Sequence, residues 1–138
     1  QHAPEYFWKP EYQRHANTAV AIGEVAMVAA QPLHYEAFLA TLSQGETVVS
    51  ADNIVRIRTP RGAVAMYSPG AFETAYGFQA PSLDAGPVLA GYRIEVENRE
   101  VALNQLDDAQ VSWRETPSGH AIGPDVASGA VMAFSEVF

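Results

Sequence analysis

Apolar runs and one helical pattern occur in the first half of the chain. Residues 19–30 (AVAIGEVAMVAA) carry a single charge, which favours a strand buried on both faces. A helix is predicted from Pro32 to its C-cap at Gly45, because apolar residues recur there at helical spacing. These residues are Tyr35, Phe38, Leu39 and Leu42. Three short strands are expected to follow, at 46–50, 53–58 and 63–68.

The second half starts after a segment, residues 69–86, that we expect to be a loop because it is rich in Pro and Gly. The pattern then begins again with a strand at 88–96 and a helix at 98–109, for which Asn98 is the expected N-cap. Three strands are predicted to complete this half, at 111–115, 119–122 and 130–136.

The two halves match each other in sequence as well as in order. Residues 62–68 (GAVAMYS) return as residues 129–135 (GAVMAFS), an offset of 67. Short Gly-Ala-Val matches also arise by chance, but element order, element type and offset agree here. We therefore predict an α+β fold of two βαβββ modules. Their helices cover the outside, and the other sheet faces line a concave groove, a natural place for a ligand.

The predicted organisation is one domain, residues 19–138, with modules at 19–70 and 86–138. Residues 1–18 are rich in Pro and aromatic residues and are predicted to form an extended N-terminal arm or interdomain connector. The aromatic side chains of the arm are expected to dock on this domain or on a neighbour. Since the sequence begins at Gln1, we expect the chain to be processed, trimmed or a fragment.

Composition excludes several classes of protein. The 138 residues suit a single domain, and the absence of Cys removes disulfides, thiolate ligands and thiol nucleophiles. The formal net charge of −8 opposes binding to a phosphate backbone, so no nucleic-acid partner is expected. No apolar run is long enough to span a membrane, so no membrane partner is expected either, and a cytoplasmic location is the default expectation.

These features together resemble the glyoxalase-like domain of the vicinal oxygen chelate superfamily, which includes glyoxalase, bleomycin resistance and extradiol dioxygenase proteins. The resemblance covers residues 19–138 and rests on the paired modules and on the strand endings YSPG at 67–70 and FSE at 134–136. Residues 2–17 also look like the connector before the second module pair of longer glyoxalase-like proteins. The resemblance implies, as partner, a second copy in a homodimer or an N-terminal glyoxalase-like domain of the same protein.

The resemblance also implies where a metal would bind. In metal-dependent members, the first and last strands of each module each supply one His, Gln or Glu ligand. Those positions fall here on Glu24 and Gly91 for the first strands, and on Ala65 or Met66 and Met132 or Ala133 for the last strands. Only one carboxylate remains of four ligands, so we expect no metal and no other cofactor.

Glu24 and Arg93 are the leading candidate site residues. Glu24 is a lone carboxylate in an apolar strand, so it is either a general base or ligand anchor in the groove, or one half of a salt bridge. Strand alternation makes Arg93 its expected partner. Arg93 itself either binds an anionic ligand or pairs with Glu24 or Glu95.

Three further side chains are candidates for ligand binding. Trp113 either stacks on a ligand or fills the groove, Tyr67 ends a strand near the rim, and His120 opens a short strand and can point inward. The aromatic residues of the connecting segment form either a lid over the groove or a hydrophobic clamp between the modules. They are Phe72, Tyr76 and Phe78.

The function predicted from these observations is a metal-free domain that binds a small, partly apolar molecule between the sheets. Two alternatives stay open: an enzyme of the lyase or dioxygenase type, and a non-catalytic scaffold of a larger protein. A groove filled by its own side chains would favour the scaffold. An open groove with Glu24 not paired to Arg93 would favour a binding domain or an enzyme.

Overall fold

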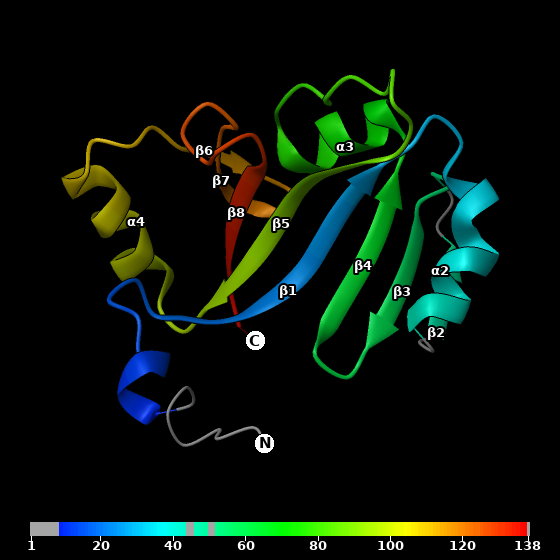
Figure 1. Cartoon of the computed structure of the whole chain (residues 1–138). Helices are drawn as coiled ribbons and strands as arrows, with labels where there is room; N and C mark the ends of the chain where they lie inside the picture. The colour runs from blue at the N-terminus through cyan, green and yellow to red at the C-terminus, as the bar shows by residue number, and fades with distance from the viewer. Residues whose placement is uncertain (1–8, 44–45, 50–51, 138) are drawn as a thin grey trace.

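The computed structural model describes residues 9–43, 46–49 and 52–137. Within these residues, eight strands form one mixed sheet in the order β2-β3-β4-β1-β5-β8-β7-β6 (Figure 1). The strands are β1 (Ala19–Val28), β2 (Glu46–Val49), β3 (Val55–Thr59), β4 (Gly62–Tyr67), β5 (Val88–Val96), β6 (Arg114–Thr116), β7 (Gly119–Ile122) and β8 (Val131–Glu136). Among the described residues, no helix is long and apolar enough to cross a membrane.

The sheet consists of two modules with the same strand arrangement. In each, the first strand pairs in parallel with the last: β1 with β4 and β5 with β8. The modules join edge to edge through an antiparallel pairing of β1 with β5, in which Glu24 lies opposite Arg93 and Ala26 opposite Gly91. The predicted α+β fold of two βαβββ modules is confirmed.

The register corrects the sequence repeat by one residue. Glu24 pairs with Ala63 in the first module, whereas Gly91 pairs with Val131 in the second. The first strands therefore correspond at an offset of 67 and the last strands at 68. Because a shift of one residue inverts the faces of a strand, Tyr67 lies on the concave face while Phe134 packs beneath the second module's helix.

Helices α2 (Glu36–Ser43) and α4 (Arg99–Asp108) cover the convex face, as predicted. A 3₁₀ turn, η2 (Pro32–Tyr35), precedes α2, and a similar turn, η1 (Pro10–Gln13), lies in the N-terminal arm. The Asn98 side chain accepts a hydrogen bond from the Val101 amide at 3.0 Å and caps α4. The predicted helix C-cap at Gly45 and the residues before Lys9 lie outside the described residues.

The predicted apolar face of α2 is only partly correct. Leu39 is buried against β3, but Phe38 and Leu42 are 62% and 70% exposed. Ala40 packs beside Leu39 on the sheet, so the helix is rotated relative to the face that the sequence spacing indicates. The prediction assumes the α-helical spacing of 3.6 residues per turn from Pro32 onward. The 3₁₀ turn before α2 has three residues per turn, so the residues that follow it face a different direction.

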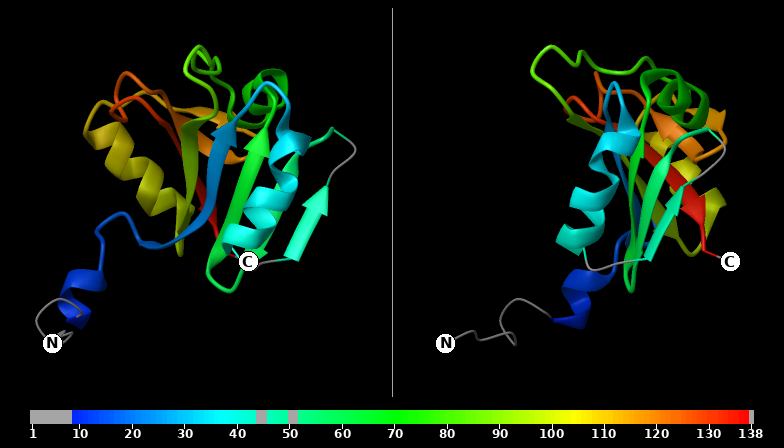
Figure 2. Two further views of the ribbon diagram at one scale, coloured as in Figure 1. Left: turned by 45° about the vertical axis from the view of Figure 1, so that its right-hand side comes forward. Right: turned by 90° about the vertical axis from the view of Figure 1, so that its right-hand side faces the viewer.

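The segment predicted as a loop contains a helix, α3 (Pro69–Tyr76). Its signals are local: the Ser68 side chain accepts from the Ala71 amide, Pro69 occupies the first helical position, and Gly77 ends the helix at φ 74°. Helix α3 lies on the face of the sheet opposite α2 (Figure 2). The concave face is therefore covered, not open, over its centre.

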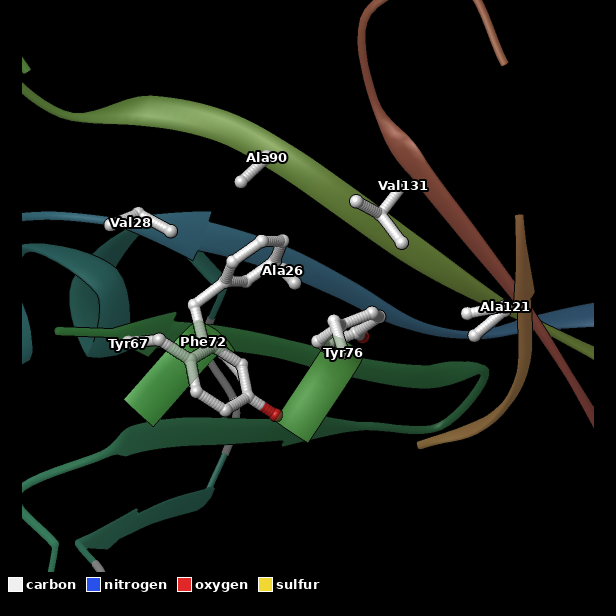
Figure 3. Packing of buried hydrophobic residues seen from close by; sticks show 10 residues of the cluster. Ala26, Val28, Tyr67, Phe72, Tyr76, Ala90, Ala121 and Val131 are labelled. Carbon is white, nitrogen blue, oxygen red and sulfur yellow. The ribbon is translucent and has the colours of Figure 1, made fainter. Parts of the chain in front are cut away.

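Two aromatic side chains of α3 fill the centre of the concave face. Phe72 and Tyr76 have no exposed surface, and their rings stack with centroids 4.9 Å apart. They point onto a floor of small residues from both modules (Figure 3). This floor includes Ala26, Ala65, Ala90, Ala121 and Ala133. The hydrophobic clamp is thus confirmed and the lid is wrong; Phe78 packs on the same cluster.

Candidate functional site

Glu24 is the centre of a buried polar network on the concave face. Its side chain is 2% exposed, and three donors from other elements reach it. Oε1 accepts hydrogen bonds from the hydroxyls of Tyr67 (2.6 Å) and Tyr76 (3.1 Å), and Oε2 accepts from Nε of Arg56 at 2.8 Å. Arg56 Nη2 also donates to the Tyr67 hydroxyl oxygen at 2.9 Å. Buried charge is tolerated here because both carboxylate oxygens of Glu24 accept hydrogen bonds from protein donors.

The network changes the acid–base properties of its members. Burial raises the pKa of Tyr67, and the neighbouring Glu24 carboxylate raises it further. Burial and the same carboxylate also raise the pKa of Tyr76. Burial lowers the pKa of Arg56, but the attraction of Glu24 outweighs this effect and the pKa lies above its ordinary value. Both phenols therefore stay protonated and act as donors to a carboxylate.

The predicted salt-bridge partner of Glu24 was Arg93, and this is corrected to Arg56. Arg93 does lie directly opposite Glu24 in the sheet, but Arg56 on β3 reaches Glu24 across the intervening strand β4. Its path crosses Ala65, which lies opposite Arg56 and has a small side chain. The register of β3 with β4 places Arg56 on the same face as Ala65.

The residues present do not fit the metal centre that the fold family implies. The register settles which candidate positions face the groove: Ala65 and Ala133 belong to the central concave cluster, whereas Met66 and Met132 pack under the helices. Gly91 faces Phe72, and Glu24 already accepts from three protein donors. In the described part of the chain, no group of three or more His, Asp or Glu side chains is placed to hold a metal ion.

A cavity of about 570 Å³ lies beside this filled centre, on the second module. Strands β5 and β8, the β6–β7 hairpin and the start of α4 form its wall. The polar residues of the wall are Arg93, Glu95, Arg99, Glu115, Thr116, Ser118, His120, Ser135 and Glu136. Nε of Arg93 is buried and has no hydrogen-bond partner.

The remaining candidates separate into two locations. Tyr67 belongs to the Glu24 network and has 2% of its surface exposed. Trp113 was predicted to face the groove, but its indole nitrogen donates to Asp107 of α4 at 2.9 Å, and its ring contacts His120 edge-on at 5.0 Å. It therefore packs near the end of α4. Only Arg93 and His120, of the predicted site residues, line the cavity.

Solved structures share this architecture and show the glyoxalase-like fold. Methylmalonyl-CoA epimerase from Mycobacterium tuberculosis matches with a TM-score of 0.66 and 12% identity, covering 94% of this chain and 96% of that protein. The hypothetical protein BH1468 from Bacillus halodurans C-125 matches with a TM-score of 0.62 and 11% identity, covering 85% and 94%.

A third match is a single-residue variant of Streptomyces coelicolor methylmalonyl-CoA epimerase in complex with 2-nitronate-propionyl-CoA. Its TM-score is 0.58 and its identity 10%, with coverage of 86% of this chain and 97% of that protein. No protein-family model matches the sequence, and a search of curated proteins finds no match. At these identities the likeness establishes the fold, and it confirms the glyoxalase-like fold predicted from the modules.

Proposed function

We propose that this chain is a metal-free glyoxalase-like domain that binds a small, partly apolar molecule in the cavity beside Arg93. The observation that carries the proposal is Arg93, a partly exposed residue that lines this cavity and forms no salt bridge among the described residues. Its Nε also has no hydrogen-bond partner. A ligand with an acidic group can pair with the guanidinium of this side chain, because Arg93 is partly exposed and lines the cavity. His120 and Ser118 line the same cavity and offer further polar contacts.

The structural neighbours support binding of a small molecule on this fold. One is a complex of methylmalonyl-CoA epimerase with methylmalonyl-CoA and NH4+, and another holds 2-nitronate-propionyl-CoA. These ligands belong to those proteins. What they support for this chain is the coarser point that the fold accommodates small organic molecules.

The Glu24 network has a structural role in this proposal. Glu24 and Tyr67 were predicted to contact ligand, but both are buried and hydrogen-bonded to other parts of the protein. A lyase or dioxygenase of the superfamily type would need ligands at positions 24, 65, 91 and 133, and three of these are Ala or Gly. We therefore assign ligand binding to the cavity of the second module and not to the centre.

A second candidate is a non-catalytic scaffold domain, favoured by a different observation. The centre of the concave face is filled by Phe72 and Tyr76, as expected for a domain whose groove has been lost to packing. A homodimer, pairing with an N-terminal glyoxalase-like domain, and a cytoplasmic location all stay predictions.

Nuclear magnetic resonance of the ¹⁵N-labelled chain tests the binding function. We expect some members of a mixed set of aromatic carboxylates and neutral aromatic fragments to shift the amides of Ser118, Gly119 and Ser135. Arg93→Gln should weaken binding of the carboxylates by about tenfold, because a charged hydrogen bond is lost. Arg58→Gln is the matched control, since Arg58 is an exposed arginine on the other module. Fragments that never shift these amides, in a chain whose spectrum shows it folded, would favour the scaffold.

A further inference from the structure

The cavity beside Arg93 is lined by charged groups of both signs. They are Arg93, Glu95, Arg99, Glu115 and Glu136. None of them forms a salt bridge with another: the ion pairs within the described residues are Arg56–Glu24 and Lys9–Glu11. One contact within the set is a long hydrogen bond, 3.5 Å, from the Arg99 backbone amide to the Glu136 carboxylate. These charges therefore line one cavity without pairing with one another in salt bridges, and Arg99, Glu115 and Glu136 are exposed.

Arg93 is the residue of the cavity that we assign to binding an anionic group. Its Nε is buried without an acceptor, although Glu24 lies directly opposite it in the sheet, because Glu24 is already bound to Arg56 and two tyrosines. A carboxylate from a ligand matches both the charge and the planar geometry of a guanidinium.

Glu95 is the residue of the cavity that we assign to binding a cationic group. It lies two residues further along β5 on the same face, about 7 Å from Arg93 along the strand. A Cβ built on Gly23 would fall 2.5 Å from Glu95 Oε1, so the carboxylate fits closely over a backbone that has no side chain. Glu115 and Glu136 add negative charge to the same wall. Arg99 is the second positive charge.

We propose that the ligand of this cavity is bipolar, with a carboxylate bound at Arg93 and an ammonium group bound among Glu95, Glu115 and Glu136. This inference rests on the proposed function and specifies its ligand class. A simple anion would meet three carboxylates, and a simple amine would meet two arginines, so a molecule carrying both charges fits the wall better than either. The spacing along β5 favours charges separated by several methylene groups over those of an α-amino acid.

Isothermal titration calorimetry on the full chain at pH 7 tests the ligand class. The probes are 6-aminohexanoate, hexanoate and hexylamine, which share one carbon skeleton, with glycine as the short bipolar probe. We expect 6-aminohexanoate to bind about tenfold or more tightly than each of the other three. Binding of hexanoate as tight as that of 6-aminohexanoate would overturn the proposal in favour of a plain anion site.

Two pairs of variants locate the charges. Arg93→Gln should weaken both 6-aminohexanoate and hexanoate by about tenfold, whereas Glu95→Gln should weaken only probes that carry the amine. The controls are Arg58→Gln and Glu97→Gln, exposed residues of the same charge, which should change neither. If Glu95→Gln leaves the preference for 6-aminohexanoate unchanged, the assignment of the cation site is wrong.

The same measurements separate failure of this inference from failure of the proposed function. If neutral or aromatic fragments shift the cavity amides while the bipolar probes do not bind, the bipolar ligand is wrong and a small-molecule site remains. If neither fragments nor bipolar probes bind to the folded chain, both proposals are wrong. A bipolar probe that binds but leaves the amides of Ser118 and Ser135 unshifted also contradicts the inference, because its site lies elsewhere.

Discussion

The Glu24 carboxylate is a buried charge with three donors, and its environment explains why an acidic residue stands in the apolar strand β1. An unpaired carboxylate at 2% exposure would strongly destabilise the fold. Two phenols and a guanidinium replace the water that Glu24 loses on folding. The guanidinium of Arg56 supplies positive charge beside the carboxylate.

The network predicts a dependence of stability on high pH. Tyr67 and Tyr76 have raised pKa values in the folded chain, whereas in the unfolded chain they ionise near pH 10. The unfolded state therefore loses these two protons first. The free energy of unfolding should be unaffected by them below about pH 10 and should fall as the pH rises above it.

Absorbance of tyrosinate at 295 nm checks this prediction. The native chain should show two of its six tyrosines still protonated at a pH where the urea-unfolded chain has ionised all of them. In a Tyr67→Phe/Tyr76→Phe double variant the delayed fraction should disappear. Six tyrosines that ionise together in the native chain, as they do in urea, would show that the network is not formed.

Sequence reasoning located this charge but not its partner. Alternation correctly placed Glu24 and Arg93 on one face, and Arg93 lies directly opposite, as expected. Arg56 is the partner because its long side chain extends over the small Ala65 and reaches Glu24 from two strands away. Such contacts depend on strand order and side-chain length together, which the alternation of residues does not specify.

At the scale of elements, α3 covers the centre of the concave face. Its two aromatic residues fill this centre, and the cavity beside Arg93 lies next to it on the second module. The helix is also fixed at its end, because the Ser118 amide donates to the Ala75 carbonyl at 3.0 Å. Small residues on the sheet make this packing possible: a Cβ on Gly91 would lie 2.7 Å from the Val131 carbonyl oxygen and 3.5 Å from the Phe72 ring.

Removal of the Phe72 ring should therefore be costly. We expect Phe72→Ala to lower the free energy of unfolding by about 3–5 kcal/mol, because it leaves a cavity in the centre of the molecule. Urea denaturation followed by circular dichroism measures the loss. Phe38→Ala is the matched control, since Phe38 is 62% exposed on α2 and should cost within about 0.5 kcal/mol. Similar losses in the two variants would contradict the central packing of α3.

The sequence contains local signals for α3, although the Pro and Gly residues of the segment 69–86 favour the prediction of a loop. Ser68, Pro69 and Gly77 are a cap, a first-turn proline and a left-handed terminus, and each has its expected role. Most of the other elements were predicted because their apolar patterns are long. An eight-residue helix contains only about two turns, so its periodicity is weak and its caps carry the information.

At the scale of the whole molecule, the internal repeat predicts the architecture. Two copies of strand, helix and three strands pair edge to edge through β1 and β5, as the matching halves indicate. The position of the candidate site did not follow from the repeat. The symmetry of the repeat suggests a site at the centre between the two modules. This centre is filled by α3, which belongs to the segment that connects the modules and is not part of the repeat.

We propose that this domain functions without a metal at the centre of its fold. Native mass spectrometry of the desalted chain, after incubation with Zn²⁺, Mn²⁺, Ni²⁺ or Fe²⁺, tests it most directly. We expect that no ion is retained stoichiometrically, because Ala65, Gly91 and Ala133 offer no ligand and Glu24 is bound by protein donors. One ion retained per chain, and lost in Glu24→Gln, would contradict this proposal and make metal-dependent chemistry the leading hypothesis.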